Sequence, residues 1–68
     1  MTLEQLLELM EYGKRVTITI DEVSTAWMHN ERSKMITNYK ENKGRQIISF
    51  TPSENSINIV LEGDKNEN

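Results

Sequence analysis

The residues with the clearest chemical potential lie in one short basic segment, residues 32–45. The segment carries five bases and one acid, a net charge of +4, although the chain of 68 residues has a net charge of −3. Binding to a polyanion follows the local field more than the total charge. The segment therefore indicates a surface for phosphate groups.

A helix over about residues 31–42 would arrange these side chains on one face. Asn30 is a favourable cap, Glu31 suits the positive first turn, and Gly44 would end the helix. Side chains three and four residues apart share a helix face, and such a face can enter the DNA major groove to meet base edges. The predicted base-reading residues are Ser33, Lys34, Thr37 and Asn38. The predicted phosphate contacts, which position a protein without reading sequence, are Arg32, Lys40, Lys43 and Arg45.

Other chemistries find little support in the sequence. With no Cys and a single His, the chain can form neither a disulfide nor a structural zinc site. It contains no Gly-rich phosphate loop and no nucleophile elbow. We therefore expect no cofactor, no metal and no catalysis. His29 is expected to be an exposed turn residue, and Glu4, Glu8 and Glu11 to form a solvated helix face.

The elements that must position the basic segment begin with an N-terminal helix. Thr2-Leu3-Glu4-Gln5 is a capping box, and leucines at helical spacing follow it, so we expect a helix over about residues 3–12 that Gly13 ends. Alternating β-branched residues predict a short strand over 15–18.

A second capping box predicts a second helix over about residues 20–28. Thr19 would be its cap and Glu22 its third residue, with Ile18 and Val23 as a hydrophobic staple. Its apolar stripe would consist of Ile20, Val23, Ala26 and Trp27.

The last third of the chain predicts a β-hairpin. Its strands would be residues 46–51 and 57–62, joined by a turn-rich loop and followed by a polar tail over 63–68. Which residues of the hairpin strands face inward is open, because Ile47 and Ile48 compete for the inward position. The sequence thus predicts one domain, residues 1–62.

The order helix, strand, helix, helix, strand, strand resembles that of winged helix-turn-helix DNA-binding domains. The resemblance centres on TIDEVSTAWMHNERSKMITNYKENKGRQII, where a Thr-x-x-Glu cap opens the first helix and a Lys-Gly pair leads to the first wing strand. It implies an α+β fold with a three-helix core and a small antiparallel sheet. It also implies a small regulator of the bacterial or phage type that binds double-stranded DNA, with its third helix in the major groove and a homodimer on a two-fold site. The chain departs from the pattern at His29-Asn30 and at the acidic wing tip, Ser53-Glu54-Asn55.

Two other functions remain open at this point. The net acidity and the acidic wing also suit a small interaction module or inhibitor that binds a protein partner, and the acids of residues 4–22 could form a DNA-mimic surface. Apolar runs of only two or three residues are too short to span a membrane. The lack of Cys fits a reducing cytoplasm, which is the location we expect. The expected core is Leu3, Leu6, Leu7, Met10, Val16, Ile18, Val23, Trp27, Met35, Tyr39, Ile48, Phe50, Ile57 and Ile59.

Overall fold

Four strands form one mixed sheet in the computed structural model, which describes residues 1–63. The elements are α1 (Leu3–Leu9), β1 (Arg15–Ile20), β2 (Val23–Met28), the 3-10 turn η1 (Ser33–Met35), α2 (Thr37–Asn42), β3 (Ile47–Pro52) and β4 (Ser56–Leu61). The predicted polar tail lies outside the described residues, apart from Gly63. No helix within residues 1–63 has the length and apolar character needed to cross a membrane.

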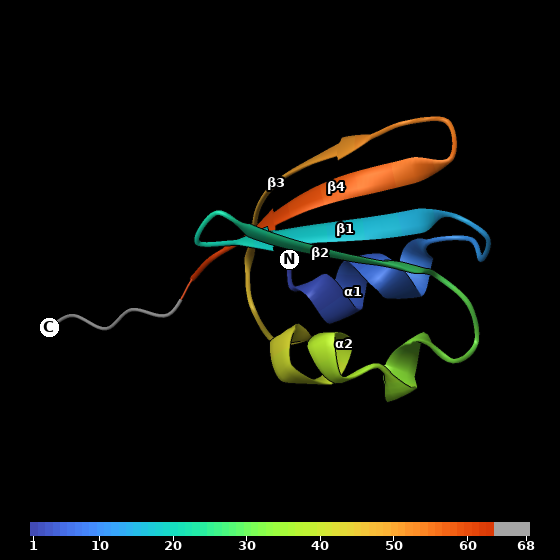
Figure 1. Ribbon diagram of the computed structural model, residues 1–68, viewed down its shortest axis with the longest axis horizontal. Helices are drawn as coiled ribbons and strands as arrows, with labels where there is room; N and C mark the ends of the chain where they lie inside the picture. The colour runs from blue at the N-terminus through green and yellow to red at the C-terminus, as the bar shows by residue number, and fades with distance from the viewer. Residues whose placement is uncertain (64–68) are drawn as a thin grey trace, which may run out of the picture.

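Two antiparallel hairpins, β1–β2 and β3–β4, are joined in the middle of the sheet by parallel pairing of β1 with β4. The strand order is β2-β1-β4-β3, so β2 and β3 are the edges. Both helices lie on one side of this sheet (Figure 1). The parallel pair requires a long crossover, and α2 lies within the segment that supplies it.

The core lies between the helices and the two central strands. Alternate residues of a strand point to one face, and β4 follows this rule, with Ile57, Ile59 and Leu61 buried and the residues between them exposed. The buried apolar residues are Leu3, Leu6, Leu7, Val16, Ile18, Tyr39, Ile57, Ile59 and Leu61.

The predicted second helix, residues 20–28, is wrong because this segment completes a β-hairpin. Asp21 and Glu22 have φ values of 51° and 72°, and positive φ at both central residues is what a two-residue type I′ turn requires. Thr19, the expected helix cap, instead places its hydroxyl oxygen 2.8 Å from that of Ser24 across the hairpin. The apolar stripe of the expected helix is therefore divided between two strands.

The predicted third helix, residues 31–42, is also wrong as a single element. Ile36 has an extended backbone, with φ −78° and ψ 129°, and it separates η1 from α2, which has six residues. A winged helix-turn-helix has two consecutive helices at this point of the chain. Here the first is replaced by the strand β2, and the second is divided into η1 and α2. The three-helix core, the all-antiparallel sheet and the family resemblance are thereby overturned, although the α+β class is right.

The predictions at the two ends of the chain come closer to the structure. The capping box of Thr2 and Gln5 is confirmed, although α1 ends at Leu9 rather than near residue 12. The C-terminal hairpin is confirmed as β3–β4, and Ile47, not Ile48, is the more buried of the competing pair. Four residues of the expected core are exposed instead: Val23, Met35, Ile48 and Phe50.

Candidate functional site

The predicted base-reading residues do not share one helix face. Ser33 is only 2% exposed and Lys34 lies beside it on η1, whereas Thr37 and Asn38 begin α2. Asn38 is half-buried, and its carbonyl accepts a hydrogen bond from the Asn42 side chain at 2.7 Å. The structure therefore separates the four residues that a recognition helix would have aligned.

The predicted phosphate-binding residues divide into two groups. Arg32, Lys40 and Lys43 are exposed. Arg45 is held in the structure, because its Nε donates to Asn42 Oδ1 at 2.6 Å and its Nη1 donates to the Glu62 carbonyl at 3.1 Å. Arg45 thus connects the end of α2 to the end of β4.

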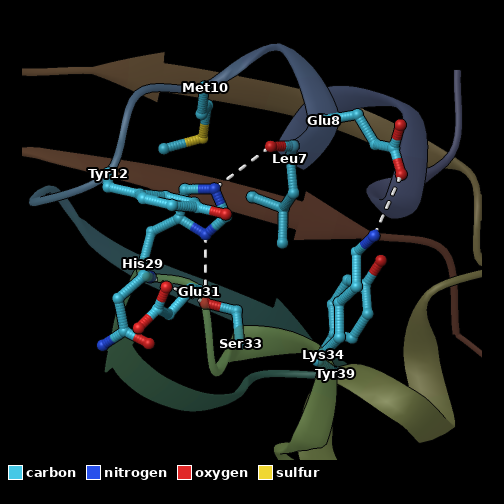
Figure 2. Close-up of a pocket in the computed structure, with 10 residues that line it drawn as sticks. Leu7, Glu8, Met10, Tyr12, His29, Glu31, Ser33, Lys34 and Tyr39 are labelled. Carbon is cyan, nitrogen blue, oxygen red and sulfur yellow. Dashed lines mark hydrogen bonds and ion pairs between the residues drawn. The ribbon is translucent and has the colours of Figure 1, made fainter.

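A cavity of about 350 Å³ opens between α1, the turn that follows it, and the segment from the end of β2 through η1 (Figure 2). Its walls are apolar or aromatic at Leu7, Met10, Tyr12 and Tyr39. Its polar lining comes from His29, Asn30 and Ser33 and from three charged side chains, which are Glu8, Glu31 and Lys34.

His29 lies at the back of this cavity, 5% exposed, with both ring nitrogens in hydrogen bonds. Nε2 is 3.1 Å from the Leu7 carbonyl, an acceptor, so Nε2 carries the proton. In the neutral ring Nδ1 then accepts from the Ser33 hydroxyl at 3.1 Å. Ser33 Oγ in turn accepts the Asn30 N–H at 3.0 Å. The Tyr12 ring packs edge-on against the imidazole, with ring centroids 5.2 Å apart. We call this arrangement the His29 latch.

The His29 latch is suited to holding segments together more than to nucleophilic catalysis. The Ser33 oxygen is buried and already engaged by a backbone N–H. The second nitrogen of His29 meets a backbone carbonyl, where an activated pair would place an acidic orienting group. The latch connects α1, the end of β2 and η1 instead. The expectation that His29 is an exposed turn residue is wrong. The four-residue spacing of His29 and Ser33 around the capping residue Asn30 was the available signal.

Glu8 and Lys34 form an ion pair at the mouth of the cavity. Lys34 Nζ is 3.7 Å from Glu8 Oε2, and the two side chains are 74% and 56% exposed. Such an exposed pair contributes little to stability. Burial raises the pKa of Tyr39, and the charges of Glu4 and Glu8 raise it further. The negative field of α1 therefore reaches the cavity wall.

Two further hollows adjoin α1, and both contain Leu9. One is formed by α1 itself together with Met1, and the other lies between the end of α1 and the β3–β4 hairpin near Pro52 and Ile57. Leu9 is 75% exposed. We define the α1 surface as Met1, Glu4, Glu8, Leu9, Met10 and Glu11.

The α1 surface and the cavity are continuous, because Glu8 and Met10 line both.

Within residues 1–63, no group of three or more His, Asp or Glu side chains is placed to hold a metal ion. Comparison with protein families, with curated proteins and with solved structures finds no match to this chain.

Proposed function

We propose that this protein is a small interaction module that binds a basic, apolar segment of a partner protein through the α1 surface. The observation that carries the proposal is a pair of exposed apolar side chains, Leu9 at 75% and Met1 at 56%, which line one hollow together with Glu4 and Glu8. Exposed apolar side chains gathered beside hollows and bordered by charge are typical of interaction sites.

The charge of the α1 surface specifies the chemistry of the partner. The surface carries three glutamates, and one base, Lys14, lines the hollow near Pro52 beside Glu11, so acids are in excess. A partner that places an apolar side chain against Leu9 and Met10 would therefore gain from basic residues beside it, since complementary charge raises association rates and disfavours acidic competitors. A basic amphipathic helix offers this combination.

The test uses a synthetic amphipathic helix of Leu and Lys, with its Leu and Glu counterpart as the peptide control. We expect saturable binding of the basic peptide alone, and Leu9→Ala should weaken it by roughly 5- to 30-fold, as truncation of an interface anchor typically does. Met35→Ala is the matched control, because Met35 is 73% exposed but lies on η1, outside the α1 surface. Equal losses for both variants, or equal binding of both peptides, would reject the proposal.

A second candidate, binding to double-stranded DNA, is favoured by the exposed cations Arg32, Lys40 and Lys43. With the recognition helix overturned, the contacts available are phosphate contacts, which carry no sequence information. Lys43→Ala should then weaken binding to every duplex alike and reduce the salt slope by about one unit. A gel-shift series at low and moderate salt tests this, and absence of any shift eliminates the candidate.

Two further properties belong to the same proposal. A homodimer remains a prediction that sedimentation analysis would test. A cytoplasmic location is supported by the cysteine-free sequence, which suits a reducing compartment, and cell fractionation would test it.

A further inference from the structure

We propose that the cavity beside the His29 latch receives one Lys or Arg side chain of the partner. This contact would anchor the partner's segment on the α1 surface. This inference rests on the proposed function, because it names the contact that would fix the partner on the α1 surface. The occupant is a cation on an aliphatic stem, and the cavity provides groups for both parts.

The walls match the stem of a long basic side chain. At about 350 Å³ the cavity is at the small end of ligand sites, a size suited to one side chain. Leu7, Met10 and the rings of Tyr12 and Tyr39 present apolar surface to it, and the aliphatic stems of Lys and Arg pack on such surface. Figure 2 shows Tyr12 on one side of the opening and Tyr39 on the other.

The mouth matches the cationic head. Two acids, Glu8 and Glu31, line the cavity, and one base, Lys34, does so. The ammonium of Lys34, 3.7 Å from Glu8, marks where a cation sits (Figure 2). Because this pair is exposed and weak, an incoming cation can displace Lys34. A guanidinium has the further advantage of bidentate pairing with a carboxylate and stacking on an aromatic ring such as Tyr12.

The back of the cavity is fixed before any partner arrives. Both ring nitrogens of His29 already have hydrogen-bond partners within the chain, so the imidazole shapes the cavity and leaves recognition to the carboxylates. A rigid receptor loses little conformational entropy on binding. The internal competitor is therefore Lys34, and removing its charge should strengthen binding.

The experiment titrates N-acetyl-L-argininamide into the protein and follows the ring protons of Tyr12 and His29 by NMR. The neutral isostere N-acetyl-L-citrullinamide is the ligand control. We expect saturable shifts with the arginine compound alone. Glu8→Gln should weaken binding by about two- to fivefold, the usual range for one charge pair in a partly exposed site, and Lys34→Met should strengthen it by about twofold. Glu41→Gln, a change to an exposed acid on α2, should leave it unchanged.

Equal shifts with the citrulline compound, or no gain for Lys34→Met, would overturn the inference. The Leu9→Ala comparison with the basic peptide fails or succeeds independently, because Leu9 lies outside the cavity. If the peptide binds in a way that depends on Leu9 but argininamide does not bind, the proposed interaction module stands and the proposed anchor fails. Argininamide binding that Glu8→Gln weakens would support the anchor.

Discussion

Replacing His29 with Ala should destabilise the protein far more than its position after an edge strand would indicate. His29 is 5% exposed and makes two hydrogen bonds, with the Leu7 carbonyl and with the Ser33 hydroxyl, each at 3.1 Å. His29→Ala removes both bonds and the edge-on contact with Tyr12.

The size of the effect follows from the groups that remain. A buried polar group left unsatisfied costs about 1–3 kcal/mol, and an edge-on aromatic contact contributes roughly 0.5–1.5 kcal/mol. Water entering the enlarged cavity would reduce the cost at Leu7 and Ser33. We therefore expect a loss of about 2–4 kcal/mol, and a fall in Tm of more than about 10 °C for a domain of this size.

Urea denaturation followed by far-UV circular dichroism measures this loss. Ser33→Ala and the double variant complete a double-mutant cycle, in which we expect a coupling energy of about 1 kcal/mol between the two residues. A loss below about 0.5 kcal/mol for His29→Ala, the range of an ordinary surface change, would refute the latch. A coupling energy of zero would show that the His29–Ser33 contact contributes nothing.

Three other predictions concern packing, backbone and pH. Ile18→Val should cost about 0.5–1.5 kcal/mol because Ile18 is buried, whereas the exposed Val23→Ala should stay within about 0.5 kcal/mol in the same denaturation assay. Gly13→Ala should cost about 1 kcal/mol because Gly13 has φ +99°, and Gly44→Ala, where φ is not positive, is its control, so equal losses would contradict the reasoning. The raised pKa of Tyr39 means that the folded state keeps this proton above pH 10, where the unfolded chain releases it. Stability from this group is therefore complete below pH 10 and falls as pH rises further. Tyr39→Phe should reduce this alkaline decline, and an unchanged pH profile would count against the assignment.

Elements with strong local signals could be predicted from the sequence. The capping box of Thr2 and Gln5 starts α1 because both of its hydrogen bonds involve residues three apart. The β3–β4 hairpin follows from two alternating segments on either side of a turn-rich loop. Both predictions depend on neighbours in the sequence, which is where such patterns are reliable.

The segment that became β2 carried conflicting signals. Thr19 and Glu22 have the spacing of a capping box, yet Val23, Thr25 and Trp27 alternate as strand residues on one face. The turn between the two strands determines which structure forms. It consists of Asp21 and Glu22, and neither is the glycine that is common in type I′ turns. Cross-strand pairing along the whole length of β1 prevailed over the local capping preference.

The central parallel pair and the candidate site could not be predicted from local patterns. β1 and β4 are about 40 residues apart in sequence, and the register of Ile18 with Ile59 follows from tertiary packing. The cavity likewise combines Glu8 from α1 with His29 and Lys34 from beyond β2. The basic segment predicts a role for Lys34. The acid that pairs with Lys34 is Glu8, which lies on the helix face predicted to be solvated.

The most direct test of the proposed function is chemical-shift mapping of the isotope-labelled protein during titration with the basic Leu and Lys peptide. We predict that the perturbed backbone amides concentrate in residues 1–12 and 29–34, around the α1 surface and the cavity. Amides of β2 and of the β1–β2 turn at Asp21 and Glu22 should remain unchanged. Perturbation confined to residues 37–45 on addition of duplex DNA, with no response to the peptide, would contradict the proposal and transfer the function to the basic segment.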